Sequence, residues 1–321
     1  MRVVIIGAGI SGLIAKGAFT KDNHDVTVCD PKLESGDFSQ HKAVMRLRDD
    51  RVNQYVNCRL KPITVTKAIY HKGEIHNKPN ILLNNLYSLK NYGALGNRSL
   101  ETLGEVDRFL ITGYAPDVRK NFIPKRVKGI SMSSGAHFRP HYWLKFSDES
   151  IVQYDICIST IPMPALMRLE GINLTGYENI SFSYNPIYVS TADLLIPSDV
   201  HQTLYFTQSY IYRVTIEGQK LIIESTDCGI TQEDFRHCVR AFGLDLATDV
   251  SDFKTVNQEI GKIVPIDDDA RRRIMMDLTN KYNIYSFGRF ATWKPLRVDQ
   301  TIDDIEKIKM LIRVGNKNYY S

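Results

Sequence analysis

The first thirty residues of the chain constrain its fold more than any other segment. Arg2–Ile6 is typical of a short buried β-strand, the turn Gly7–Gly12 follows at once, and Leu13–Phe19 continues as an apolar helix. A second strand, Asp25–Cys29, ends on Asp30. Strand, glycine-rich turn, helix, strand and terminal acid in this order form the βαβ fingerprint of dinucleotide-binding folds. The sequence therefore predicts an α/β fold built around a Rossmann-like domain.

The residues of the glycine-rich turn have distinct predicted tasks. Gly7 allows the tight turn, Gly9 lets the backbone approach a pyrophosphate, and Gly12 lets the helix pack closely on the strand. The pyrophosphate would lie at the helix N-terminus, at Ile10 and Ser11, where N–H groups and the helix dipole favour an anion. The Ser11 hydroxyl can add a hydrogen bond to a phosphate oxygen.

The carboxylate of Asp30 narrows the choice of dinucleotide. It would accept a hydrogen bond from a ribose 2′-OH, whereas the 2′-phosphate of NADP needs cations and would be repelled. The fingerprint by itself leaves both NAD and FAD open.

Composition predicts a two-domain cytoplasmic protein. The chain has 321 residues, 43% of them apolar, without the run of about 18 apolar residues that a membrane span requires. The first strand begins at residue 2, so no signal peptide is expected. The five cysteines are an odd number without a CxxC pair, which predicts reduced thiols and no metal site.

The charge balance is mildly basic. The formal net charge is +5 and the isoelectric point about 8.8. This balance suits an anionic substrate or a polyanion such as nucleic acid, and it is also common among ordinary enzymes.

Periodicity is weak between residues 50 and 115. It suggests a surface helix over 50–58, short strand-like runs at 81–83 and 86–89, and a helix over 99–110. The last of these has Leu100, Leu103, Val106 and Leu110 on one face.

Patterns beyond residue 115 are stronger. They predict a strand entering a hairpin over 122–132, a hairpin over 142–154, a buried strand over 155–161, strands through 180–226, a helix over 231–243, a strand over 283–288 and a helix over 299–313. This order indicates a nucleotide-binding domain (1–60, 116–170 and 281–321) interrupted by a mostly antiparallel α+β substrate domain (61–115 and 171–280).

Three separated segments carry a family resemblance. They are Val3–Leu13, Tyr154–Pro162, and Ile284–Phe290, the last followed by Asp299–Thr301. Together they resemble the FAD-dependent amine oxidase superfamily of GR2-type flavoproteins, and within it the UDP-galactopyranose mutase-like branch. The resemblance implies FAD rather than NAD, because in that family a strand ending in Gly-Arg and the helix after it close the flavin site.

The resemblance also implies cofactor contacts outside the fingerprint. Arg289 would balance the charge of the flavin or pyrophosphate, the helix start at Asp299 and Gln300 would direct N–H groups toward the flavin, and the Val127 backbone would contact the adenine end. The cofactor-binding residues expected on this basis are Val127, Gly288, Arg289, Asp299, Gln300 and Thr301.

Catalytic and substrate residues are expected in the loops and in the second domain. His41 belongs to a segment similar to the histidine-bearing flavin loop of the mutase branch, although the second histidine of that loop is absent. Lys262 would hydrogen-bond a water near flavin N5, as a lysine does in amine oxidases. Arg46 is a candidate for an anionic substrate group. The remaining candidates for the substrate pocket are Tyr205, Tyr212, Arg213 and Trp293.

The leading hypothesis is oxidation of an amine or amino-acid-like group, with a hydride passing to flavin N5. Three alternatives remain open at this point. They are a flavin-dependent nucleotide-sugar mutase, a flavoenzyme acting on an amino-modified base in DNA, and a flavin-binding protein without catalysis. The expected partner is a small-molecule or nucleotide-linked substrate, with nucleic acid as the less favoured option.

Overall fold

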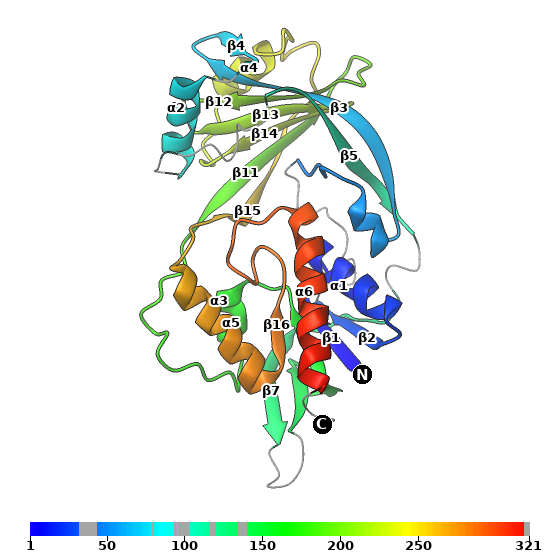
Figure 1. Ribbon diagram of the computed structural model, residues 1–321. Helices are drawn as coiled ribbons and strands as arrows, with labels where there is room; N and C mark the ends of the chain where they lie inside the picture. The colour runs from blue at the N-terminus through cyan, green and yellow to red at the C-terminus, as the bar shows by residue number, and fades with distance from the viewer. Residues whose placement is uncertain are drawn as a thin grey trace.

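The structure is a computed structural model that describes residues 1–31, 44–78, 80–92, 95, 103–115, 120–133 and 140–317. The predicted catalytic residue His41 lies outside these residues. Figure 1 shows two units, a parallel sheet with its helices below and a larger mixed sheet above. Strands β3, β5, β11 and β15 extend from the upper unit toward the lower one.

The lower unit is built on a five-stranded sheet in which all paired strands run parallel. Its order is β16 (Ile284–Ser286), β10 (Ile156–Ser159), β1 (Arg2–Ile6), β2 (Asp25–Cys29) and β6 (Phe122–Ile123). The central strands are continuous apolar runs because both faces of the sheet are covered. The strand order reverses direction between β1 and β10, and such a reversal opens a crevice at the carboxyl ends of the strands.

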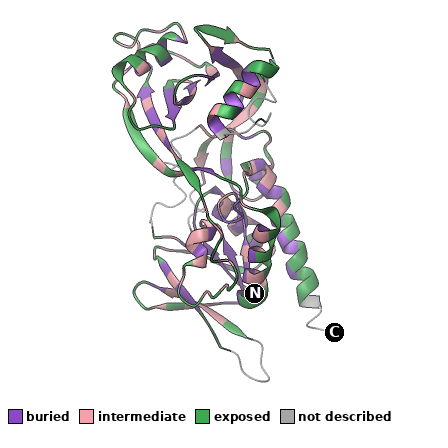
Figure 2. Ribbon diagram, turned by 90° about the vertical axis from the view of Figure 1, so that its left-hand side faces the viewer, coloured by how far each residue is buried: buried purple, intermediate pink, exposed green. Residues whose placement is uncertain are grey.

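Each face of the parallel sheet has its own layer. Helices α1 (Ile10–Lys21) and α6 (Val298–Lys317) cover one face. The other face carries the meander β7 (Val127–Ser133), β8 (His141–Phe146) and β9 (Ile151–Tyr154), with the helices α3 (Met163–Met167) and α5 (Asp268–Tyr282). The residues between the sheet and each of these layers are buried. In this unit, exposed residues lie mainly on the outer side of α6 and at the outer ends of β7 and β8 (Figure 2).

The upper unit is an eight-stranded sheet. Its order is β15 (Lys254–Ile263), β11 (Tyr184–Asp193), β14 (Lys220–Ser225), β13 (Ile211–Glu217), β12 (His201–Phe206), β3 (Cys58–His71) and β4 (Glu74–His76), with β5 (Gly104–Tyr114) also paired to β3. Among the described strands of this sheet, β12 and β3 are the one parallel pair, and the others are antiparallel. Helix α4 (Gln232–Arg240) packs on the outer face, and helix α2 (Ile81–Tyr92) packs at Ile69 and Tyr205 on the inner face.

The fold class predicted from the sequence is therefore confirmed, and so are most of the elements expected beyond residue 115. The strand expected over 122–132 is divided into β6, which joins the parallel sheet, and β7, which pairs with β8. Among the described residues, no helix is both long and apolar enough to cross a membrane. The predicted domain boundaries stay a prediction. Helix α5, which falls inside the 171–280 segment, packs on the parallel sheet through Ile274 and Leu278.

Three local predictions between residues 50 and 115 were wrong. Residues 81–92 form helix α2 instead of short strands, and 104–114 form strand β5 instead of a helix. The 50–58 segment contains only the 3-10 turn η2 (Arg51–Gln54) before β3 begins. Helix α2 carries apolar residues on both sides, so they do not by themselves mark its buried face, which includes Leu83 and Tyr87. Its buried polar residues are Asn84, Ser88 and Asn91, whereas Ile81, Leu82, Leu86 and Leu89 are exposed.

Candidate functional site

The glycine-rich turn has the backbone geometry that its sequence predicts. Gly7 has φ +98°, a left-handed conformation that side chains disfavour, and its N–H donates to the Cys29 carbonyl at 2.8 Å. A Cβ at Gly12 would lie 2.0 Å from the Gly7 carbonyl oxygen, so only glycine allows α1 to pack this closely. A Cβ at Gly9, the N-cap of α1, would meet no atom within 4 Å. The turn thus leaves open space beside Gly9, at the start of α1.

Thr160 connects the glycine-rich turn to the end of the neighbouring strand β10. Its hydroxyl donates to the Ile6 carbonyl at 2.9 Å, and it lies where β10 ends beside β1. Ile10 and Ser11 form the first turn of α1, and the Ile10 side chain is buried in the core. The N-cap of α1 receives no side-chain hydrogen bond, so its N-terminal amides keep their capacity to bind an anion.

Asp30 closes the turn from the neighbouring strand. Its Oδ2 accepts a hydrogen bond from the Ala8 N–H at 2.9 Å, and its own N–H donates to the Ile123 carbonyl at 3.1 Å. The carboxylate is only partly buried, so it can still accept from a ribose hydroxyl. Val127, at the start of β7, is buried in the core, and its predicted backbone contact with adenine stays a prediction.

The C-terminal part of the chain returns to the same turn. Gly288 follows β16 with φ +87°, and a Cβ there would lie 2.3 Å from the Ser11 hydroxyl. Gly288 and the first turn of α1 are therefore in direct contact. This contact joins the predicted tail of the site to its head.

The first turn of α6 is held by local hydrogen bonds. Gln300 accepts from the Arg297 N–H at 3.0 Å, and Thr301 donates to the Val298 carbonyl at 2.6 Å. Asp299 is buried and forms an ion pair with Arg297 at 3.3 Å. Gln300 caps the helix start, and all three side chains are engaged locally, so a cofactor would meet the backbone amides of this turn rather than the side chains of Gln300 and Thr301.

Arg289 connects this tail to the mixed sheet. Its guanidinium donates to the Gly261 carbonyl at 3.3 Å, beside Lys262. A Cβ at Gly261 would lie 2.4 Å from the Ile187 side chain, and β15 is irregularly paired with β11 at this point. Such bulges redirect side chains next to functional sites. Contacts therefore run without a break from Ser11 through Gly288 and Arg289 to Lys262.

Lys262 is buried in a polar and aromatic setting. Its side-chain amine lies 3.7 Å from the centre of the Tyr212 ring and donates to Asn91 Oδ1 at 3.3 Å. Burial is the main cause that lowers its pKa to about 7, and Arg213 and other nearby cations lower it further while Glu224 opposes them. Lys262 is therefore partly neutral near pH 7, as a group that accepts a proton must be.

Two predicted substrate arginines are engaged in buried ion pairs. Arg213 binds Glu224 through two hydrogen bonds of 2.6 and 2.7 Å. Arg46 binds Glu217 at 2.7 Å and Thr203 at 2.8 Å. These contacts give both arginines a structural task, and their predicted substrate roles stay untested.

The predicted aromatic residues fall into two environments. Tyr205 and Tyr212 pack with Tyr87 of α2 on the inner face of the mixed sheet, close to Lys262. Trp293 is completely buried in the core of the lower unit, where its indole N–H donates to the Val264 carbonyl at 2.9 Å. That packing favours a core role for Trp293, because a substrate could not reach its ring.

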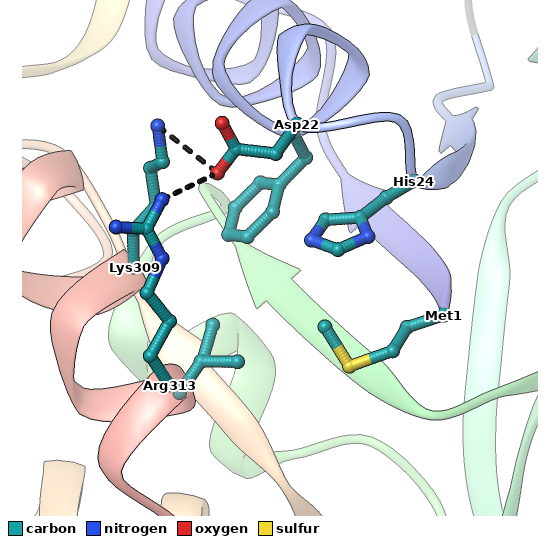
Figure 3. A pocket seen from close by; sticks show the side chains of 7 residues that line it. Met1, Asp22, His24, Lys309 and Arg313 are labelled. Atoms are coloured by element: carbon teal, nitrogen blue, oxygen red, sulfur yellow. Dashed lines mark hydrogen bonds and ion pairs between the residues drawn. The ribbon is translucent and has the colours of Figure 1, made fainter. Parts of the chain in front are cut away.

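A cavity of about 340 Å³ lies at the opposite end of the parallel sheet (Figure 3). It is lined by Met1, Phe19, Asp22, His24, Lys309, Ile312 and Arg313. Asp22 forms ion pairs with Lys309 at 3.1 Å and with Arg313 at 3.2 Å across it. The cavity therefore lies where ion pairs join the end of α1 to α6, away from the glycine-rich turn.

Comparison with solved structures identifies proteins of the same architecture. Reduced UDP-galactopyranose mutase is similar over 97% of this chain and 96% of that chain (TM-score 0.64, 16% identity). Putrescine oxidase bound to putrescine is similar over 98% and 99% (TM-score 0.64, 11% identity). A CLA-producing fatty acid isomerase from P. acnes is similar over 96% and 97% (TM-score 0.60, 10% identity).

The chain has the fold of these oxidases and isomerases. The fold that the family resemblance implied is thus confirmed. No protein-family profile matches the chain, and no curated protein sequence matches it.

Several residues of the site were not predicted from the sequence. Thr160 could have been recognised, because polar residues at the carboxyl ends of parallel strands gather at one edge. Asn91 and Glu224 carry no such signal, since their partners Lys262 and Arg213 are distant in sequence or on another strand. Lys67 lies on β3, which was not recognised as one strand, and Arg108 lies on β5, which was predicted to be a helix.

Proposed function

We propose that this chain is an FAD-dependent oxidoreductase that oxidises an amine or amino-acid-like group. The observation that carries the proposal is the convergence of the glycine-rich turn, Gly288 and the near-neutral Lys262 along one line of contacts. Perturbed ionisable groups beside a ligand-binding turn are characteristic of functional sites.

The residues present fit FAD. The open space at Gly9, the α1 N-terminus without a side-chain cap and the partly exposed Asp30 suit a pyrophosphate and a ribose. FAD would be held by Gly7, Gly9, Ile10, Ser11, Gly12, Asp30, Val127, Gly288, Arg289, Asp299, Gln300 and Thr301. When bound, FAD supplies the acceptor for the hydride that leaves the carbon next to the amine nitrogen.

The protein's own contribution to the reaction centres on Lys262. Its neutral amine takes a proton from the substrate ammonium group, which leaves the substrate nitrogen with the lone pair that drives loss of the hydride. Tyr212 and Asn91 hold the Lys262 amine in place. Arg289 adds positive charge beside the cofactor. His41 stays a catalytic candidate on sequence grounds.

The test is an anaerobic screen of the purified flavoprotein against amines and amino acids, in which loss of the flavin absorbance (bleaching) is measured. Lys262→Met should retain FAD and bleach about 100-fold more slowly at pH 7.5. The wild-type rate should rise as pH passes 7, because the neutral amine is the active form. Lys254→Met, which removes an exposed lysine from the same strand, is the matched control. A protein that takes up no FAD, or an unchanged rate in Lys262→Met, would contradict the proposal.

A second candidate is isomerisation of a nucleotide sugar by reduced flavin. The observation that favours it is the excess of cations over carboxylates on the inner face of the mixed sheet. Turnover of a UDP-sugar only after dithionite reduction would select it. Amino-modified DNA belongs in the same screen, and a flavin that no substrate bleaches would indicate a non-catalytic flavin-binding protein.

A further inference from the structure

The inner face of the mixed sheet carries cations from three neighbouring parts of the chain. On β3, Val65 and Lys67 share this face, and Arg108 of β5 lies on it because it pairs with Ile63. Lys67 is also opposite Thr203 of β12, which receives a hydrogen bond from Arg46. Register alone therefore places Lys67 and Arg108 on the face that looks toward the parallel sheet.

The acids of this face are already engaged. Glu217 forms its ion pair with Arg46, and Glu224 is held by two hydrogen bonds from Arg213. Within the part of the chain that the structure describes, Arg108 forms no ion pair with a carboxylate. Its guanidinium donates to the carbonyl of Asp107, next to it in sequence. The two buried acid–arginine pairs thus leave Arg108 without an ion-paired carboxylate among the described residues, although Asp299 lies within electrostatic reach.

The charge of Arg108 acts electrostatically on Lys67. Burial lowers the pKa of Lys67 to about 7, and the positive charge of Arg108 is the next largest cause. Burial also lowers the pKa of Arg108, as does the nearby Arg48, while Tyr205 and Asp299 oppose this. Cations gathered in a partly buried position repel one another, and an anion placed among them would relieve that repulsion.

The cation cluster lies beside the proposed reaction centre. Strand β13, which carries Arg213, lies between β15 of Lys262 and β3 of Lys67 in the sheet, and Arg213 acts electrostatically on both lysines. Arg108 is also within electrostatic reach of Asp299, in the first turn of α6. A substrate extending from Lys262 across the inner face would therefore bring its far end to Lys67 and Arg108.

We propose that Lys67 and Arg108 form a subsite for an anionic group, carboxylate or phosphate, at the far end of the substrate. A guanidinium beside an ammonium supplies directional donors together with a compact charge, and both groups form strong hydrogen bonds to these anions. A diamine such as putrescine would meet repulsion there. The claim that the bound anion is part of the substrate rests on the proposed function. The claim that an anion binds at Lys67 and Arg108 does not.

The experiment is calorimetric titration of the protein with succinate, inorganic phosphate and putrescine in the presence of excess FAD, which fills the predicted pyrophosphate site. We expect succinate or phosphate to bind and putrescine not to bind, and the stronger of the two anions identifies the group. Lys67→Met and Arg108→Met should each weaken anion binding about tenfold, whereas Arg108→Lys should retain most of it. Lys254→Met, which removes the same charge from the opposite edge of the sheet, should bind as the wild type does.

Binding of putrescine alone, or equal anion affinity in all variants, would overturn the subsite. Anion binding that depends on Lys67 and Arg108 without bleaching by any amine would retain the subsite and reject the oxidase. If amines bleach the flavin and Arg108→Met changes the bleaching rate neither with amino acids nor with neutral amines, the oxidase would be retained and the subsite rejected.

Discussion

Lys262→Met tests the electrostatics of the site without any substrate. Lys262 is 8% exposed, and its pKa is lowered from 10.5 to about 7, first by burial. Between pH 7 and 9 the native state releases this proton while the unfolded chain still binds it. The unfolded state therefore carries more protons, and this lysine makes the free energy of unfolding rise with pH.

The magnitude follows from the two pKa values. Each unit of pKa difference corresponds to about 1.4 kcal/mol, and the native lysine is about half protonated at pH 7. The stability of the wild type relative to Lys262→Met should therefore increase by about 2 kcal/mol between pH 7 and pH 9. Methionine binds no proton, so any constant loss of packing or hydrogen bonding cancels from this difference.

The assay is urea unfolding of both proteins at pH 7, 8 and 9, with Lys254→Met as the exposed control on the same strand. The difference between wild type and Lys254→Met should stay nearly constant with pH. If wild type and Lys262→Met show parallel pH dependence, Lys262 is not held neutral by burial. The argument for a proton acceptor at this position would then fail.

Three further outcomes are expected. Gly288→Ala should cost about 2–4 kcal/mol, because its positive φ and a Cβ 2.3 Å from the Ser11 hydroxyl both disfavour a side chain. In urea unfolding, the double variant Ser11→Gly/Gly288→Ala should regain the part of the lost stability that the clash causes. If the losses of the two single variants simply add in the double variant, the contact between Ser11 and Gly288 would be contradicted. Glu224→Gln should cost about 3 kcal/mol in urea unfolding, since Arg213 loses its buried carboxylate; a change below about 0.5 kcal/mol would contradict this. Anion binding should weaken as pH rises from 6.5 to 8.5, because a bound anion favours protonated Lys67; calorimetry of Lys67→Met should show a flatter profile.

Helix α2 illustrates where sequence periodicity is insufficient. Its exposed side carries Ile81, Leu82, Leu86 and Leu89, so apolar residues lie on both sides and do not by themselves mark the buried face. Its inner side combines Leu83 and Tyr87 with polar residues, among them Asn91, which binds the Lys262 amine. A pattern read along the chain cannot anticipate a partner that arrives from a strand far away.

Strand β5 shows the converse effect. Leu103, Val106 and Leu110 have helical spacing, yet 104–114 pair with residues 58–67 of β3. Backbone hydrogen bonds to a long neighbouring strand outweigh a weak local preference. The candidate Arg108 was missed for this reason, since only the strand puts it on the same face as Lys67.

The sequence by itself determined the parts of this protein whose physics is local. A glycine that must adopt positive φ, a glycine that lets a helix touch a strand, and an acid at the end of the next strand are set by backbone sterics within thirty residues. The tertiary structure decided the chemistry around that turn. It placed Gly288 against Ser11, engaged Arg46 and Arg213 with acids, and buried Lys262 until its amine became partly neutral. Charge and pKa depend on burial and on neighbours from distant strands, and these exist only once the chain has folded.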